Sequence, residues 1–293
     1  MQDSVELVAV RALRHMYGIE VPEYQRKVLG AALGRLGRGG GAEAAVERLL
    51  RRDSEAWDVV IDAITIPETY FFRHYPHFLR LRELATERFR RGRSCRVLSA
   101  GCSSGEEAWS AAAVLAEAGS GRSTPRSSVV GWDVNARRLI EASEGRYRDW
   151  SVRTGLHGYE HYVGRVGDHY RVSPALLPWA RFERVNLVGP LPEERFDAIF
   201  FRNVAIYFDP STARAVFTRI AALLEDDGMI FVGPSDPVTL PQDEWEHVIA
   251  DGVRVYRRVK ARAAAPARPS QAPERPAGVS PTLAPPRPRD ARL

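Results

Sequence analysis

The chain has 293 residues, of which 44% are hydrophobic and 27% are charged, an ordinary globular composition. Its formal net charge of +5 lies entirely within residues 260–293, where seven Lys and Arg residues stand against two acidic ones. Residues 1–259 are therefore electrically balanced, which argues against a nucleic-acid-binding domain.

Apolar residues at helical spacing predict an all-α N-terminal domain over residues 1–66, built from about four helices. The run from Gly37 to Gly41, nearly all glycine, marks a turn inside this domain, and Pro67 ends it. Residues 67–94 are predicted to form a linker that contains one further helix, from Thr69 to Arg90.

Residues 95–259 alternate short apolar strands with helices, which is typical of an α/β fold with a doubly wound parallel sheet. The expected strands are 96–100, 129–133, 196–201 and 229–233, and the expected helices are 106–118, 135–144 and 211–224. A turn is predicted at 226–228, and residues 245–259 predict a terminal β-hairpin.

Two stretches depart from this alternation. Residues from about 147 to 185 are rich in Gly, His, Tyr and Pro and predict a small inserted β subdomain. Residues 260–293 hold eight of the twenty prolines and cannot bury a core, so we expect a disordered Pro/Ala/Arg tail there.

The N-terminal sequence, the longest apolar runs and the cysteines indicate in which cellular compartment the protein is expected. The first residues lack the basic and apolar pattern of a signal peptide, and no apolar run approaches the ~20 residues that cross a bilayer. Cys95 and Cys102 flank one predicted strand and fit reduced core or loop residues better than a disulfide framework. We therefore expect a cytoplasmic protein without membrane insertion.

A glycine loop joins the strand that ends at Ala100 to a helix whose first turn carries Glu106 and Glu107. Such loops often cradle phosphate, but two carboxylates oppose a pyrophosphate, and no Gly-Lys-Ser/Thr follows. Asp133 ends the next strand, where an acidic residue can reach the ribose hydroxyls of an adenosine ligand; a helix cap is an equal alternative for Asp133 taken alone. The Glu pair favours a ligand with adenosine and a cation, which predicts S-adenosylmethionine.

Four segments in register resemble the CheR-type chemoreceptor glutamate O-methyltransferase family. They are Thr65–Arg73, Ala100–Glu107, Asn186–Leu187 and Phe196–Phe208, and the resemblance covers roughly residues 5–258. It implies a class I (Rossmann-like) S-adenosylmethionine methyltransferase fold with an N-terminal helical domain, an inserted β subdomain and a terminal hairpin. It also implies methyl transfer from S-adenosylmethionine, with S-adenosylhomocysteine as product, to glutamates in the cytoplasmic domain of a chemoreceptor-like protein, and we expect a monomer.

The resemblance also places the site, residue by residue. Arg73 and Tyr207 become candidate catalytic residues that orient the acceptor carboxylate, although a core aromatic is an equal interpretation of Tyr207. Phe71 and Phe72 fit a core better than a cofactor stack. The implied cofactor-binding residues are Thr69, Arg73, Gly101, Glu106, Glu107, Asp133, Asn186, Leu187, Arg202 and Asn203.

Two departures from the family pattern keep other functions open. Pro67 stands where members have asparagine, and Gly233–Asp236 replaces Gly-His-Ser-Glu, which affects the acceptor pocket. The alternatives are a regulatory S-adenosylmethionine- or S-adenosylhomocysteine-binding module without turnover, and a methyltransferase with another acceptor. Adenine-N6 transfer is disfavoured because Val204 and Ala205, not a Pro-Pro-aromatic run, follow Asn203. Two pairs of histidines lie close in the sequence, His74 with His77 and His157 with His161. No pattern for a third ligand accompanies either pair, so no metal site is expected.

Overall fold

Four helices open the chain, as the apolar spacing predicts. In the computed structural model, which describes residues 2–37, 39–120, 127–250 and 253–259, they are α1 (Gln2–Tyr17), α2 (Glu23–Leu36), α3 (Gly41–Leu50) and α4 (Ser54–Ile64). They enclose their own core around Leu13, Leu29 and Trp57. The domain boundary predicted at residue 66 stays a prediction, and the predicted tail at 260–293 lies outside the described residues.

The next helix begins later than predicted. It is α5 (Pro76–Arg90), so the segment from Thr69 to Tyr75 is not helical. Phe72 and His74 have φ angles of 54° and 57°, in the left-handed region, which a right-handed helix cannot contain. Proline at the first helical position then fixes the start of α5.

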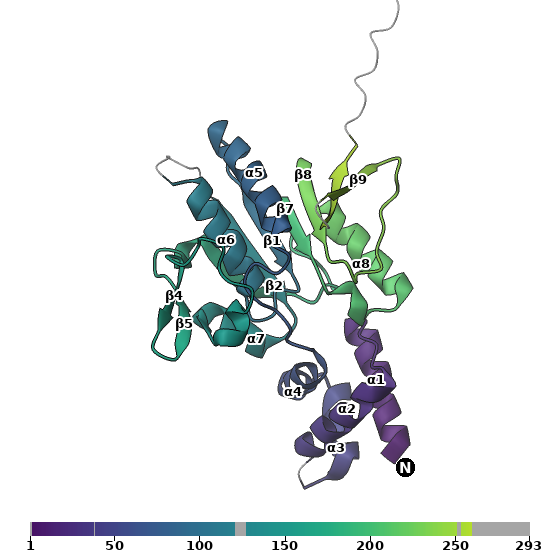
Figure 1. Cartoon of the computed structure of the whole chain (residues 1–293). Coiled ribbons are helices and arrows are strands. Elements are labelled where there is room, and N and C mark those ends of the chain that lie inside the picture. Colours follow the sequence, from purple (N-terminus) through teal and green to yellow (C-terminus); the bar gives the residue numbers. More distant parts are fainter. Residues whose placement is uncertain (1, 38, 121–126, 251–252, 260–293) are drawn as a thin grey trace, which may run out of the picture. The chain divides into compact units, whose positions relative to one another are not determined.

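A seven-stranded sheet with the order β6-β2-β1-β7-β8-β10-β9 forms the centre of the structure (Figure 1). Its neighbours are parallel from β6 to β8, and β10 pairs antiparallel with both β8 and β9 as the predicted hairpin. The doubly wound α/β prediction is therefore confirmed. The strands are β1 (Arg96–Ala100), β2 (Ser128–Asp133), β6 (Ala180–Arg184), β7 (Phe196–Phe201), β8 (Leu224–Val232), β9 (Trp245–Ala250) and β10 (Val253–Arg258).

Two predictions about this sheet are wrong in detail. The turn expected at 226–228 lies inside β8, because a register irregularity after the Phe196–Leu224 pair absorbs the additional residues before Ala198 pairs with Met229. Strand β6, predicted as part of the insertion, instead pairs with β2 at the edge of the main sheet. The separate small sheet contains only β3 (Arg146–Tyr147), β4 (Val163–Val166) and β5 (His169–Val172).

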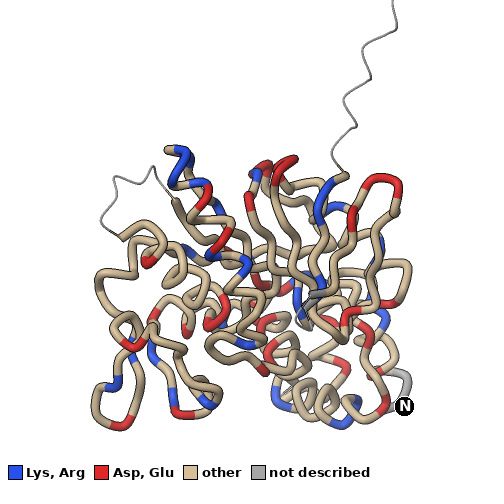
Figure 2. Tube along the Cα trace, turned by 45° about the horizontal axis from the view of Figure 1, so that its top comes forward, with Lys and Arg blue, Asp and Glu red and all other residues tan. Residues whose placement is uncertain are grey.

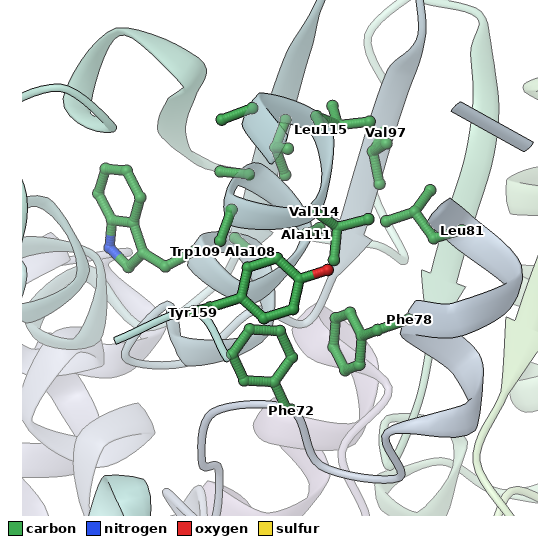
Figure 3. Close-up of a cluster of buried hydrophobic side chains, with 14 of the residues drawn as sticks. Phe72, Phe78, Leu81, Val97, Ala108, Trp109, Ala111, Val114, Leu115 and Tyr159 are labelled. Carbon is green, nitrogen blue, oxygen red and sulfur yellow. The ribbon is translucent and has the colours of Figure 1, made fainter. Parts of the chain in front are cut away.

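Helices cover both faces of the main sheet. Helices α5 and α6 (Glu106–Ala118) lie on one face and α8 (Pro210–Ala222) on the other (Figure 1), while α7 (Ala136–Glu144) packs near β2 and β6. On the α5 and α6 face, Phe72 and Phe78 meet Tyr159 from the insertion beside α6 (Figure 3). Phe71 and Phe72 are 0% and 1% exposed, so their core assignment is confirmed.

Charge is mixed over the described part of the chain. Short segments of Lys and Arg and of Asp and Glu are scattered among one another along the described trace (Figure 2), as the balanced charge of residues 1–259 predicts. Cys95 and Cys102 are both buried free thiols. Among the described helices, none combines the length and the apolar character that a membrane crossing requires.

Candidate active site

A pocket of about 1000 Å³, open at its mouth, lies at the carboxyl ends of the parallel strands. Ligands of doubly wound folds bind at this edge of the sheet. Glu106 is the one predicted site residue that does not line it. The ten that do are Thr69, Arg73, Gly101, Glu107, Asp133, Asn186, Leu187, Arg202, Asn203 and Tyr207.

The glycine loop after β1 forms one wall and needs its glycines for space and for conformation. Gly101 and Gly105 have φ angles of 77° and 91°, in the region that favours glycine. A side chain at Gly101 would also collide with Val204, from the loop after β7. The two loops therefore approach closely, and the backbone of the glycine loop remains accessible to a ligand.

Asp133 lies beside this loop at the end of β2. Its two carboxylate oxygens accept hydrogen bonds from the backbone N–H of Ser103 (2.7 Å) and of Asn135 (2.8 Å). The N-cap of α7 is Asn135, whose side chain accepts from the Arg138 N–H, so the alternative that Asp133 caps this helix is wrong. Burial raises the pKa of Asp133, and each oxygen keeps lone pairs for a further donor.

The two carboxylates at the start of α6 have protein partners. Glu107 accepts hydrogen bonds from the Ser99 hydroxyl (2.8 Å) and from Nη1 of Arg202 (2.7 Å). Glu106 points elsewhere, where the hydroxyls of Ser104 and Ser151 donate to it at 2.8 Å and burial raises its pKa. The cation that faces Glu107 is thus Arg202, and the two glutamates are not a free negative pair awaiting a ligand cation.

The loop after β7 is held by a residue that the sequence did not identify. Asp236 is 1% exposed and accepts hydrogen bonds from three consecutive backbone N–H groups, those of Asn203 (2.5 Å), Val204 (2.9 Å) and Ala205 (2.9 Å). Asn203 has a φ of 57°, so these bonds support a left-handed residue at the pocket wall. In the sequence, only the departure from the family pattern at Gly233–Asp236 pointed to this residue. Gly233 leaves room for the Asp236 carboxylate, which a side chain at Gly233 would meet.

The two candidate catalytic residues both contact the segment 65–69. Nη1 of Arg73 donates to the Glu68 carbonyl (2.7 Å), and its buried Nε has no partner among the described residues. The Tyr207 hydroxyl is within 3.2 Å of both the N–H and the carbonyl of Ile66, and burial raises its pKa. Both side chains, with Thr69, line the pocket, which favours a site role for Tyr207 over a core aromatic.

The N-terminal helices complete the wall, which sequence patterns did not predict. Tyr17, the last residue of α1, and Ile19, two residues beyond it, line the pocket. The side-chain amide of Asn186 donates to the Met16 carbonyl (2.8 Å), and the Glu20 N–H donates to the Tyr207 carbonyl (2.8 Å). Asn186 therefore fixes the helical segment against the sheet edge, while Leu187 supplies apolar surface.

These residues fit S-adenosylmethionine. The partly exposed Asp133 carboxylate suits the ribose hydroxyls, and the Arg73 Nε without a partner among the described residues suits the cofactor carboxylate. The glycine loop leaves backbone room where a Cβ would collide. Apolar surface from Leu187 and Val204 suits an adenine ring. When bound, the cofactor supplies an electrophilic methyl group on a sulfonium.

The doubly wound sheet with its glycine loop, terminal hairpin and carboxyl-end pocket defines a class I (Rossmann-like) methyltransferase fold. Residues 67–253 match the family model described as "CheR methyltransferase, SAM binding domain". The chain belongs to the CheR methyltransferase family.

Named relatives agree with this assignment. The chain is 34% identical over 206 residues to the "Probable biofilm formation methyltransferase WspC" of Pseudomonas aeruginosa, covering 68% of this chain and 48% of the relative. It is 37% identical over 197 residues to the "Chemotaxis protein methyltransferase" of Salmonella typhimurium, covering 63% of this chain and 65% of the relative. The chain thus spans about half the length of the first of these relatives.

Proposed function

We propose that this chain transfers a methyl group from S-adenosylmethionine to glutamate side chains in the cytoplasmic part of a chemoreceptor-like protein. The observation that carries the proposal is the pocket at the carboxyl ends of the strands, which places Asp133, the glycine loop and Arg73 around one space. Family membership supports the cofactor, and the name of the Salmonella typhimurium relative, a chemotaxis protein methyltransferase, supports the acceptor. We also propose that the protein is cytoplasmic and monomeric.

In this proposal the protein positions its ligands and needs no general base. A glutamate carboxylate with a pKa near 4.3 is already ionised at neutral pH and can act as the nucleophile. We assign Arg73 two roles, binding the cofactor carboxylate and orienting the acceptor carboxylate through charge-assisted hydrogen bonds. The Tyr207 hydroxyl, which lines the same pocket, is the second candidate for orienting the acceptor. Holding two reactants in line can supply about 7–11 kcal/mol of the barrier reduction.

The pairing of Glu107 with Arg202 changes how the cofactor charge is accommodated. Arg202 neutralises Glu107 inside the wall, so we assign Glu107 a role in fixing the wall and not in holding the sulfonium. Asp133 keeps free acceptor capacity in the pocket. Selection of an adenosine ligand without phosphates then rests on the shape and the neutral lining of the pocket.

The test is methyl transfer by the full chain to a purified receptor cytoplasmic fragment, with S-adenosylmethionine labelled in its methyl group. We expect label in the fragment and release of labelled methanol in base, the sign of a carboxyl ester. A fragment whose acceptor glutamates are changed to glutamine is the control and should stay unlabelled. Binding of S-adenosylhomocysteine without any transfer would support the regulatory module, and base-stable label would indicate another acceptor group.

A further inference from the structure

A buried hydrogen-bond network runs through the pocket wall and ends at a histidine outside the pocket lining. It begins at Ser99 in β1, passes through Glu107 in α6, and reaches Arg202 after β7. Nη2 of Arg202 then donates to the Arg73 carbonyl (2.7 Å) and contacts Nδ1 of His74 (2.9 Å). Arg202 is 5% exposed, so these partners replace water around its charge.

The chemistry of arginine fixes which form of His74 takes part. A guanidinium has only donors, so Nδ1 of His74 must be the acceptor in this contact and cannot carry a proton. His74 is therefore the neutral tautomer with its hydrogen on Nε2. The two N–H groups of Nη2 are then both used, one on the Arg73 carbonyl and one on the neighbouring imidazole.

The segment that these bonds hold is strained. Phe72 and His74, on either side of Arg73, both have left-handed φ angles, which bulky residues rarely adopt. The Ser110 hydroxyl accepts from the Phe72 N–H (2.9 Å), and Arg202 binds the carbonyl of Arg73. The backbone that carries Arg73 is thus held from both sides, and His74 is part of the second anchor.

We propose that His74 is a positioning residue for methyl transfer, acting through Arg202 to fix the backbone of Arg73 at the pocket. This inference rests on the proposed function. His74 is not itself a lining residue and touches no reacting atom; it accepts the hydrogen bond that orients Arg202, which does line the pocket. Loss of that acceptor frees Nη2, loosens the turn and misplaces the Arg73 side chain.

The surroundings of His74 keep it in the accepting form. The charged and titratable groups that face it are Arg202, Arg73 and His77. Burial, with Arg202 and Arg73 nearby, lowers the pKa of His74 to about 4. The imidazole is therefore neutral throughout the range in which the enzyme would work.

Three substitutions of His74 distinguish loss of its hydrogen-bond acceptor from loss of side-chain bulk and from relief of backbone strain. His74→Asn keeps a side-chain acceptor and tolerates the left-handed conformation. His74→Leu keeps bulk without an acceptor, and His74→Gly relieves the strain without an acceptor. We expect His74→Leu and His74→Gly to lower kcat by about ten- to hundredfold, because displacements near 1 Å can cost about 10²-fold. His74→Asn should stay within about threefold of the parent protein.

Because Arg73 is also assigned to the cofactor carboxylate, the KM for S-adenosylmethionine and the Kd for S-adenosylhomocysteine should rise in His74→Leu and His74→Gly and stay near the parent values in His74→Asn. His161→Leu is the matched control, because His161 is an exposed histidine that contacts Glu117 away from the pocket. Wild-type activity of His74→Gly, or a loss in His74→Asn equal to that in His74→Leu, would overturn the proposal. His74→Gly keeps the test valid if His74→Leu does not fold.

A second measurement does not depend on turnover. In protein labelled with nitrogen-15 at histidine, the imidazole shifts of His74 should show a protonated Nε2 and an unprotonated, hydrogen-bonded Nδ1 between pH 6 and pH 8. The opposite tautomer, or a protonated ring at pH 6, would refute the network. An inactive parent protein with the expected tautomer would instead refute the proposed function and leave the network intact.

Discussion

Two buried arginine–carboxylate clusters lie at opposite ends of the same sheet. At the amino ends of the strands, Arg88 in α5 pairs with Asp197 of β7 (2.6 Å) and with Asp227 of β8 (2.5 Å). At the carboxyl ends, Arg202 pairs with Glu107 (2.7 Å). Both arginines are about equally buried, at 4% and 5% exposed.

The difference lies in what else each cluster binds. At the amino end, Asp197 also accepts from the Arg96 N–H (2.6 Å) and Asp227 from Arg93 (2.6 Å), so the cluster joins α5 to three strands. At the carboxyl end, the remaining bonds of Arg202 go to the strained turn beside the pocket. The same chemistry therefore stabilises the sheet at one end and positions a site at the other, which explains why burial of an ion pair alone does not identify function.

The largest effect should come from breaking the amino-end cluster. Arg88→Leu leaves the buried Asp197 without its cation, and removing one partner of a buried pair costs about 3–5 kcal/mol. We expect the free energy of unfolding, measured by urea titration, to fall by that amount. The affinity of the folded variant for S-adenosylhomocysteine should stay within about twofold.

Arg90→Leu is the matched control on the same helix, because the Arg90 side chain is 64% exposed and, within the described part of the chain, pairs only with Glu87. Its free energy of unfolding should fall by less than about 1 kcal/mol. Equal losses in the two variants would contradict a stabilising role for the amino-end cluster. A large loss of ligand affinity in Arg88→Leu would contradict the separation of the two ends.

A smaller effect, on ligand affinity instead of stability, is expected at the pocket. Asp133→Ala removes the carboxylate that we assign to the ribose hydroxyls, and such a loss costs about 1–3 kcal/mol of binding. Calorimetry should show the Kd for S-adenosylhomocysteine raised by roughly ten- to hundredfold. Asp168→Ala, at an exposed loop, is the control and should bind as the parent does. Unchanged affinity in Asp133→Ala would reduce Asp133 to a turn-forming residue that accepts from Ser103 and Asn135.

The sequence predicted the parts of this site that local patterns determine. Strand β1, the glycine loop and the start of α6 follow one another within a few residues, and Asp133 ends the next strand. Parallel strands bring such loops to one edge of the sheet, so their convergence followed from the fold class. Family resemblance added Arg202, Asn203 and Tyr207, which the pocket brings to the same edge.

The remaining features depend on contacts between distant segments. Glu107 and Arg202 are 95 positions apart, so no local pattern showed that the charge of Glu107 is already compensated. Asp236 reaches back to Asn203, and Asn186 reaches Met16 across 170 positions. The sequence predicts helix at the left-handed turn around Arg73, because the residues from Thr69 to Tyr75 include no helix breaker before Pro76.

The smallest effect concerns a buried histidine behind Arg202. His77 is 1% exposed, and neither ring nitrogen has a hydrogen-bond partner among the described residues. Burial, with Arg202 and His74 nearby, lowers the pKa of His77 to about 2, whereas an unfolded histidine titrates near 6.5. Between these values the unfolded chain binds a proton that the native state does not, so the free energy of unfolding falls as the pH falls below about 6.5.

His77→Leu removes this proton uptake and leaves no hydrogen bond broken within the described residues. Relative to the parent, its free energy of unfolding should therefore rise by about 2 kcal/mol between pH 7.5 and pH 5. Urea titrations of both proteins at the two pH values measure this difference. Comparing the two proteins cancels the pH-dependent contributions of carboxylates such as Asp133 and Asp236, whose pKa values burial raises in both. His161→Leu, at an exposed histidine, should show no comparable change. A difference that stays constant with pH would mean that His77 can be protonated in the native state, and Arg202 would then lie beside a second cation instead of a neutral ring.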